Sequence, residues 1–231
     1  MRKFCVFFGI LAIVLMGCAS EPPLSRPFNP NVNPLIGEWV IANDVGCCVY
    51  TYYEDGRATN VCPPNNRNIT GTYTFTDSSI TTRTAAGSFP VNYQLRGHGM
   101  RVHNRQTNNS WTVILRPYFD LAQNLRTNEA ARNEFPVNSS ELAGIQGVWR
   151  MAGRNQVTYT FSGTNFTLTS AQGRAPRYVS GTFKINDGIV LFLVNNEPVG
   201  VFTYEHIGNT LLFSAIWGTD GYTWWGDYVK Q

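Results

Sequence analysis

Three cysteines in the first half of the chain could form a covalent cross-link. A turn expected around residues 54–56 would place Cys48 opposite Cys62 on neighbouring strands, while Cys47 points to the other face. Cross-strand neighbours have Cβ atoms about 4.5–5.5 Å apart, somewhat farther than a disulfide needs. We therefore predict a Cys48–Cys62 disulfide that depends on this turn, with Cys47–Cys62 as the alternative. The remaining thiol is either buried and inert or pairs between molecules.

Metal binding and catalysis have weaker support in the sequence. The three thiolates could hold a metal ion, but adjacent cysteines on a strand diverge and no histidine lies near them. The histidines, His98, His103 and His206, are scattered, and the chain contains neither an HExxH nor a GxSxG motif. Its sparse carboxylates show no facing pair of the kind that a glycosidase uses. We expect no enzymatic activity, no cofactor and no metal site.

Clustered aromatic residues give the clearest indication of binding. The segments "YTYY" (50–53) and "GYTWWGDY" (221–228) place large rings on both faces of a strand, so some rings must point outward. Exposed tyrosine and tryptophan side chains stack on sugars, apolar ligands or a partner protein, or they cover another part of the chain. The candidate binding aromatics are Tyr50, Tyr52, Tyr53, Trp224 and Trp225.

The composition is typical of antiparallel strands joined by many turns. Charged residues make up 14% of the chain, against about 25% in typical soluble proteins, and Thr, Asn, Ser and Gly take their place. The formal net charge of +3 comes from 18 basic and 15 acidic residues, and two of the basic residues, Arg2 and Lys3, belong to an N-terminal leader. Since the rest of the chain is nearly neutral and has no basic run, we expect no nucleic-acid partner.

The leader has the features of a bacterial lipoprotein signal peptide. Two cations precede an apolar run from Phe4 to Met16, which is shorter than the about 20 residues of a transmembrane helix. The stretch Leu15-Met16-Gly17-Cys18 resembles a lipobox, in which the cysteine becomes the lipidated first residue of the mature protein. The alternatives are an ordinary secreted protein and an N-terminal anchor helix.

The lipobox resemblance implies a membrane partner and a location. Acyl chains on Cys18 would hold the protein at a membrane, with about 0.8 kcal/mol from each buried methylene. Ala19 stands where an aspartate would retain a lipoprotein at the inner membrane, so an outer membrane of a bacterial cell envelope is favoured. The proline-rich segment 19–34 is expected to form an extended tether behind this anchor.

The rest of the chain contains an internal repeat, which indicates two similar units. A Gly-x-Trp motif ends at Trp39 and again at Trp149, 110 residues later. Three longer pairs of segments follow in the same order: "TGTYTFTD" (70–77) with "SGTFKIND" (180–187), "YQLRGHGM" (93–100) with "YEHIGNTL" (204–211), and "WTVILRP" (111–117) with "WGDYVKQ" (225–231).

Each repeat alternates short apolar and polar runs with turn signals about every ten residues, such as Asp55-Gly56. Eight hairpin-linked strands per repeat fit an up-and-down barrel. Between the repeats, Asp120 is placed to cap a short helix. We therefore predict an all-β chain with two tandem eight-stranded antiparallel up-and-down β-barrels, joined by a partly helical linker.

The predicted organisation has five parts. A lipoprotein signal peptide (1–18) ends at the lipidated cysteine, and the proline-rich tether (19–34) follows it. The first barrel (35–117), the linker (118–142) and the second barrel (143–231) make up the folded protein.

Both repeats resemble the small lipocalin-like, or calycin-type, domains of bacterial lipoproteins. The resemblance is carried by the Gly-x-Trp on the first strand, the eight antiparallel strands and a basic residue on the last strand. It implies that an indole closes the floor of each barrel beneath a cation, with Arg116 over Trp39 and Lys230 over Trp149. Such a contact contributes about 0.5–2 kcal/mol. These residues are structural in the family, so the resemblance implies a fold rather than an activity.

Two functions remain open on this architecture. An eight-stranded barrel is wide enough either to be filled by its own side chains or to hold one small ligand. The first hypothesis is a non-enzymatic envelope lipoprotein that binds a small apolar or amphiphilic ligand inside at least one barrel. The alternative is a protein-interaction or inhibitor module whose filled barrels act through their outer surfaces. The interior volume of each barrel distinguishes the two hypotheses.

Overall fold

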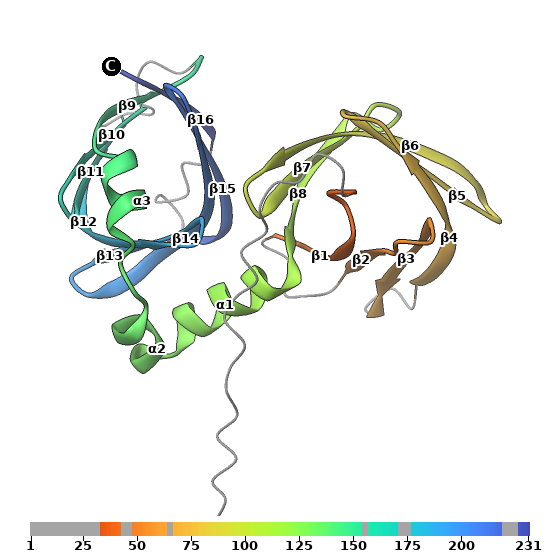
Figure 1. Ribbon diagram of the computed structural model, residues 1–231, viewed down its shortest axis with the longest axis horizontal. Helices are drawn as coiled ribbons and strands as arrows, with labels where there is room; N and C mark the ends of the chain where they lie inside the picture. The colour runs from red at the N-terminus through yellow and green to blue at the C-terminus, as the bar shows by residue number, and fades with distance from the viewer. Residues whose placement is uncertain (1–32, 43–47, 64–66, 154–156, 171–176, 219–225) are drawn as a thin grey trace, which may run out of the picture.

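The protein consists of two closed β-barrels (Figure 1). In each barrel the strands pair antiparallel with their neighbours in the sequence, and the last strand pairs with the first. The prediction of two tandem eight-stranded barrels is confirmed. The structure is a computed structural model that describes residues 33–42, 48–63, 67–153, 157–170, 177–218 and 226–231.

Barrel 1 comprises the first eight strands, which follow one another around the barrel in chain order. Their bounds are β1 (Gly37–Ile41), β2 (Val49–Tyr52), β3 (Arg57–Cys62), β4 (Arg67–Phe75), β5 (Ser79–Thr84), β6 (Gly87–Arg96), β7 (Gly99–Asn104) and β8 (Asn109–Leu115).

Barrel 2 repeats this arrangement after a helical linker. The linker helices are α1 (Arg116–Thr127), α2 (Glu129–Glu134) and α3 (Ser139–Gly144). The strands of barrel 2 are β9 (Gly147–Met151), β10 (Val157–Ser162), β11 (Asn165–Ser170), β12 (Arg177–Asn186), β13 (Ile189–Val194), β14 (Glu197–Ile207), β15 (Thr210–Gly218) and β16 (Gly226–Lys230).

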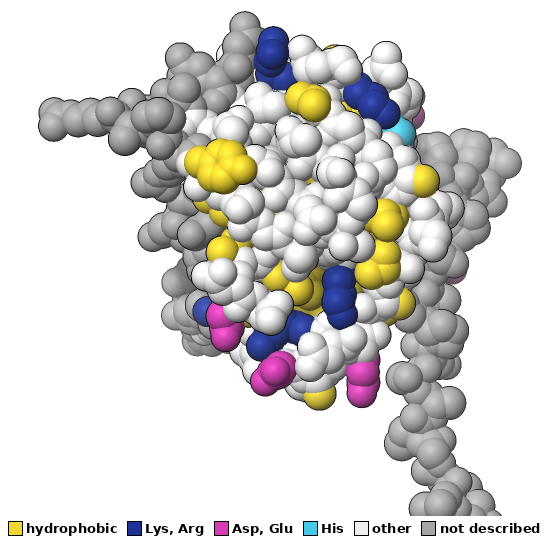
Figure 2. All heavy atoms as spheres, turned by 90° about the vertical axis from the view of Figure 1, so that its left-hand side faces the viewer, with side chains coloured by type: hydrophobic (Ala, Val, Ile, Leu, Met, Phe, Trp, Pro, Cys, Tyr) yellow, Lys and Arg dark blue, Asp and Glu magenta, His cyan; other side chains and the backbone are white. Residues whose placement is uncertain are grey.

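The alternation of side chains along the strands explains why each sheet closes around an apolar interior. On β10, Val157, Tyr159 and Phe161 are buried, while Thr158 and Thr160 between them face the other side of the sheet. Figure 2 looks onto barrel 2 from outside, where hydrophobic and charged side chains appear as separate spots on a largely uncharged polar surface. On β10 the apolar side chains therefore face the interior of the barrel and the threonines face outward.

A glycine in the fourth strand of each barrel lets a neighbouring strand approach closely. A Cβ atom on Gly71 would overlap the backbone carbonyl of Arg83, and one on Gly181 would overlap that of Leu193. Any other residue would push the two strands apart. These are the glycines of the repeated "TGTYTFTD" and "SGTFKIND" segments, so this part of the sequence repeat reflects a shared packing requirement.

The two tryptophans of the repeated motif occupy equivalent positions. Trp39 and Trp149 are at most 1% exposed. Each indole Nε1 donates a 2.7 Å hydrogen bond to the carbonyl oxygen four residues earlier, that of Leu35 in barrel 1 and of Ile145 in barrel 2. The repeat is thus structural as well as sequential, and each indole ties the strand to the segment that leads into it.

The cation expected over each indole is found in barrel 2. The Nζ atom of Lys230 lies 5.4 Å from the centroid of the Trp149 ring, and the two residues pair across β16 and β9. In barrel 1 the residue that pairs with Trp39 is Leu115. An apolar side chain therefore stands where barrel 2 has its lysine.

The expectation for Arg116 is wrong by one residue of register. Because β8 ends at Leu115, Arg116 is the first residue of α1 and not part of the last strand. Its guanidinium pairs with Glu38 at 2.9 Å and with Asp120 at 3.8 Å, and its side chain is 47% exposed. Among the described residues it makes these contacts at the barrel rim rather than a contact with the Trp39 ring.

Helix α1 packs against the outer face of barrel 2. Its buried residues Tyr118, Phe119, Ala122 and Leu125 share one hydrophobic cluster with outward-facing residues of β13 to β15, such as Leu191. The linker is therefore part of the folded protein, and Figure 1 shows it running from barrel 1 to barrel 2.

The predicted cap of this helix is also wrong. Asp120 lies within α1, and the helix begins four residues earlier, with Leu115 at its N-cap and a proline in its first turn. Proline suits a helix start because its missing N–H would have no partner there. The next helix, α2, does have a side-chain cap, since Asn128 accepts a hydrogen bond from the backbone N–H of Ala131.

The end of β6 and the β6–β7 turn of barrel 1 join the two barrels, first through an ion pair whose arginine is buried. Arg96, only 3% exposed, contacts Asp227 of β16 with its Nη1 atom at 2.5 Å and donates to the side chain of Gln94 at 2.9 Å. Burial lowers the pKa of the Arg96 guanidinium, and the nearby carboxylate of Asp227 opposes that change.

The next two residues of the turn extend this contact. The backbone N–H of Gly97 donates to Glu205 at 3.1 Å, and a Cβ atom on Gly97 would lie 2.6 Å from the carbonyl oxygen of Tyr204. The ring of His98 stacks on Tyr118 of α1 with centroids 3.5 Å apart. This turn, referred to below as the joint, therefore fastens barrel 1 to both the linker and barrel 2.

Candidate functional site

Barrel 1 contains an interior cavity of about 230 Å³. Inward-facing side chains of β2 to β8 form its walls. Tyr52 and Met100 line its inner part, and Arg67, Phe89 and Trp111 line the part nearer to the β5–β6 and β7–β8 turns.

The cavity occupies the half of the barrel away from the floor. The buried side chains of Leu35, Trp39, Ile80 and Leu115 fill the floor half and do not line the cavity. At the other end, Phe89 lines the cavity and is also 41% exposed. That end, referred to below as the mouth, is therefore the side from which a ligand would enter.

The register of the two sheets explains why barrel 1 has room for a ligand. Thr82 pairs with Tyr73 in barrel 1, just as Phe192 pairs with Phe183 in barrel 2. A small side chain thus stands in barrel 1 where a phenylalanine fills barrel 2. The same comparison matches Ala58 with Phe166, Val91 with Phe202 and Val102 with Phe213.

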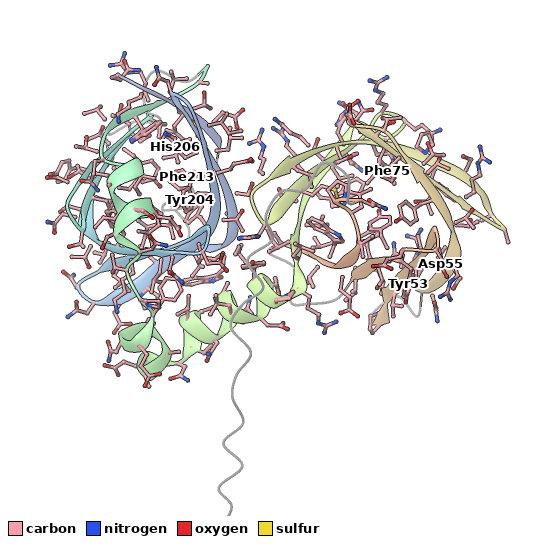
Figure 3. The ribbon with its side chains drawn as sticks, viewed as in Figure 1. Tyr53, Asp55, Phe75, Tyr204, His206 and Phe213 are labelled. Atoms are coloured by element: carbon pink, nitrogen blue, oxygen red, sulfur yellow. A yellow bond between two sulfur atoms is a disulfide. The ribbon has the colours of Figure 1, made fainter. Side chains whose placement is uncertain are left out.

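The interior of barrel 2 is filled by packed aromatic rings. The Phe192 ring lies with its centroid 5.6 Å from that of Tyr159, 4.8 Å from Phe166, 5.4 Å from Phe202 and 6.2 Å from Phe213. These separations fall in the range at which aromatic pairs attract one another. Figure 3 shows Tyr204 and Phe213 from the neighbouring strands β14 and β15 of this barrel.

The walls of the cavity combine aromatic, aliphatic and uncharged polar side chains with one cation. Within the part of the chain that the structure describes, Arg67 is the only charged residue that lines the cavity, and none of the ion pairs there includes it. Burial raises the pKa of the Tyr50 hydroxyl, while a hydrogen bond with Asn60 and the positive charge of Arg67 oppose this rise. The arrangement offers an apolar chamber with hydrogen-bonding groups and a positive charge at its mouth.

The predicted disulfide between Cys48 and Cys62 is present, with Cα atoms 4.2 Å apart. Cys62 pairs across β3 and β4 with Arg67, so the disulfide lies at the mouth of the cavity. It ties the start of β2 to the end of β3 beside that cation. Cys47 lies outside the described residues.

The candidate aromatics divide between the cavity and the surface. Tyr50 and Tyr52 line the cavity, and burial raises the pKa of Tyr52. Tyr53 instead lies outside, 36% exposed, with the guanidinium of Arg57 4.9 Å from its ring centroid; Figure 3 shows it near Asp55 of the β2–β3 turn. "YTYY" therefore contributes alternate rings to the interior, as a strand must.

Other predicted site residues lie outside the part of the chain that the structure describes. These are the lipidation candidate Cys18, with its signal peptide and most of its tether, and the aromatics Trp224 and Trp225. No helix within the described residues is long and apolar enough to cross a membrane.

A second polar group, beside α3, has a structural role. The carboxylate of Glu141 accepts hydrogen bonds from the backbone N–H groups of Asp187 and Gly188 at 2.9 and 3.1 Å and from the Tyr204 hydroxyl at 2.6 Å. Burial and this carboxylate raise the pKa of Tyr204. Across the described ranges, no group of three or more His, Cys, Asp or Glu side chains is placed to hold a metal ion.

Two important residues of the cavity were not singled out from the sequence. Arg67 sits among polar residues near a strand end, where a solvent-exposed arginine is unremarkable. Thr82 could have been identified from the sequence, because it lies 110 residues before Phe192, and 110 residues is the offset of the repeat. A position-by-position comparison of the two repeats therefore predicts which barrel interior has small side chains and which is filled by aromatic rings.

No protein-family model matches the sequence, and no curated protein matches it either. The geometry alone shows two barrels consistent with a lipocalin-like fold, one with an interior cavity and one filled by its own side chains.

Proposed function

We propose that the protein is a non-enzymatic lipoprotein of a bacterial cell envelope that binds a small apolar or amphiphilic ligand inside barrel 1. The lipobox-like Leu15-Met16-Gly17-Cys18 supports the envelope location, with the outer membrane favoured. The cavity of barrel 1 supports ligand binding, and it is the observation that carries the proposal.

The cavity has the mixture of surfaces that small-molecule sites use. Ligand pockets are mostly apolar, with a few polar groups that fix the orientation of the ligand. Here Trp111, Val102 and Met100 provide apolar contact, while Asn60 and Asn104 provide hydrogen-bonding groups. At about 230 Å³ the cavity is smaller than the range of about 300–1,000 Å³ for drug-sized ligands, so it suits a molecule with a few rings or one short chain.

Barrel 2 has a different role in this proposal. Because aromatic rings fill its described interior, the alternative function of a filled barrel acting through its outer surface applies to barrel 2 alone. Its outer face already binds α1 of the same chain.

A neutral fluorescent probe tests the binding function. N-phenyl-1-naphthylamine carries no charge at neutral pH and emits strongly only in apolar surroundings. Titration of the full chain with this probe should give a saturable increase in fluorescence. Thr82→Phe places in barrel 1 the side chain that fills barrel 2 and should abolish most of the increase.

Thr81→Phe is the matched control. It introduces the same ring one residue earlier, on the outward face of β5, where Thr81 pairs with Thr74 of β4. This variant should bind the probe as the unchanged protein does. Equal binding by both variants, or no saturable binding by the unchanged protein, would refute a ligand site inside barrel 1.

A further inference from the structure

We propose that the ligand of barrel 1 is an anionic amphiphile whose apolar part occupies the cavity and whose negative group pairs with Arg67 at the mouth. This inference rests on the proposed function, since it names the class of molecule that the same cavity takes. It follows from the charge at the mouth, from the position of Arg67 and from the arrangement of the acidic residues.

Arg67 is a cation at the edge of an apolar chamber. It begins β4, opposite the disulfide-bonded Cys62, and is the only charged residue among the described residues that line the cavity. A neutral ligand that filled the chamber would remove water from part of the guanidinium without replacing the lost hydrogen bonds. An anion would replace them with charge-assisted bonds, and a guanidinium fits carboxylate, sulfate and phosphate oxygens in a two-pronged geometry.

The neighbouring polar groups suit the same head group. Tyr50 and Asn60 share a hydrogen bond close enough to Arg67 for its charge to oppose the rise in the Tyr50 pKa. Asn104 lines the cavity from β7. These groups can donate hydrogen bonds to an anion, and no carboxylate is among the described residues that line the cavity.

The described charges of barrel 1 are distributed unevenly between its two ends. Arg67, Arg83 and Arg105 lie toward the mouth, on strand ends or in the β7–β8 turn. The described acidic side chains lie toward the floor end, where Arg57, Arg96 and Arg116 accompany them: Glu54 and Asp55 in the β2–β3 turn, Asp77 in the β4–β5 turn and Glu38 near the start of β1. Such a distribution attracts anions to the mouth and raises their rate of entry.

A series of ligands that each carry an eight-carbon chain tests the inference. Octanoate, octan-1-ol and octyltrimethylammonium share a chain and carry a negative charge, no charge and a positive charge at neutral pH. Each competes with N-phenyl-1-naphthylamine for the full chain, and the concentration that displaces half of the probe is measured. We expect octanoate to act at about one tenth of the concentration of octan-1-ol, which corresponds to about 1.4 kcal/mol, and the cation to be the weakest.

Variants of Arg67 test whether this side chain causes the preference for octanoate over octan-1-ol. Arg67→Met should bring octanoate to the level of octan-1-ol, and displacement of the probe by octan-1-ol in this variant shows that the cavity is still formed. Arg67→Lys should keep most of the preference. Arg83→Met, which removes an exposed cation from the neighbouring strand without touching the cavity wall, should reduce it only slightly.

The outcomes separate the inference from the proposed function. Equal displacement by octanoate and octan-1-ol, or a preference that survives in Arg67→Met, would overturn the anionic ligand and leave a neutral apolar one. Failure of every ligand and of the probe to bind would instead overturn the binding function itself. The preference should also shrink with rising salt, because a partly exposed ion pair is screened.

Discussion

Lys230 and Trp149 form a cation–ring contact across the closing strands of barrel 2, with the ammonium nitrogen 5.4 Å from the indole centroid. Barrel 1 lacks this pair, since Leu115 faces Trp39 at the equivalent register. The indole makes the same hydrogen bond in both barrel floors. The residue that faces it differs, because barrel 1 has a leucine there and barrel 2 has a lysine.

Replacement of these cations should affect stability unequally. Lys230→Met removes a contact over an indole and should lower the free energy of unfolding by about 0.5–1 kcal/mol. Arg116→Met removes only exposed ion pairs and should cost between about 0 and 1 kcal/mol, with a value near zero expected. Urea unfolding followed by tryptophan fluorescence measures both. A larger loss from Arg116→Met than from Lys230→Met would contradict the structural assignment.

Loss of the disulfide should destabilise barrel 1. The bridge closes a loop with a sequence separation of 14, for which chain entropy predicts about 3 kcal/mol. The double variant Cys48→Ser with Cys62→Ser should unfold at a correspondingly lower urea concentration. Peptide mapping without reductant should recover the two cysteines in one linked fragment. Recovery of Cys47 linked to Cys62 would instead support the alternative pairing.

Opening barrel 2 should cost far more than closing the cavity of barrel 1. Phe192→Thr removes a ring that contacts several other rings, and loss of a buried phenylalanine typically costs about 3–5 kcal/mol. Thr82→Phe places a ring in a space that already exists and should change stability much less. Chemical denaturation of both variants measures the contrast. Equal destabilisation would show that the cavity of barrel 1 does not accept a ring.

Breaking the Arg96–Asp227 ion pair should lower the free energy of unfolding, because it leaves a buried charge without its partner. Asp227→Asn leaves the Arg96 guanidinium buried opposite a neutral partner, and removal of one member of a buried pair costs up to about 3–5 kcal/mol. Since the Asp227 side chain is 39% exposed, we expect a loss below that range. Glu38→Gln, whose partner Arg116 is exposed, is the control and should cost less than about 1 kcal/mol. A similar small loss in both variants would mean that water reaches Arg96.

Most of the fold could be predicted from the sequence because the repeat carries it. Trp39 and Trp149 mark equivalent strands, and Gly71 and Gly181 mark an equivalent close approach of two strands. The two repeats therefore keep the same order and spacing of strands although most of their side chains differ. The Cys48–Cys62 pairing followed from the Asp55-Gly56 hairpin. Local signals of this kind are set by backbone geometry and are visible in one sequence.

The errors arose where a single residue of register decides the outcome. Arg116 and Lys230 look equivalent by sequence, but β8 ends one residue before the arginine and the chain turns into α1. Strand ends depend on which neighbour pairs with them, and that is a tertiary property. The cavity of barrel 1 was not predicted for a related reason. Its volume depends on the combined size of side chains on β2 to β8, and no single residue indicates it.

The location of the joint has a consequence for exchange of the ligand. Arg96 ends β6, and Gly97 and His98 form the β6–β7 turn, which lies at the floor end of barrel 1, opposite the β5–β6 and β7–β8 turns of the mouth. Under the proposed function, a ligand can therefore enter and leave the cavity of barrel 1 without separating the two barrels. Exchange of that ligand would then leave the contacts between barrel 1 and barrel 2 in place.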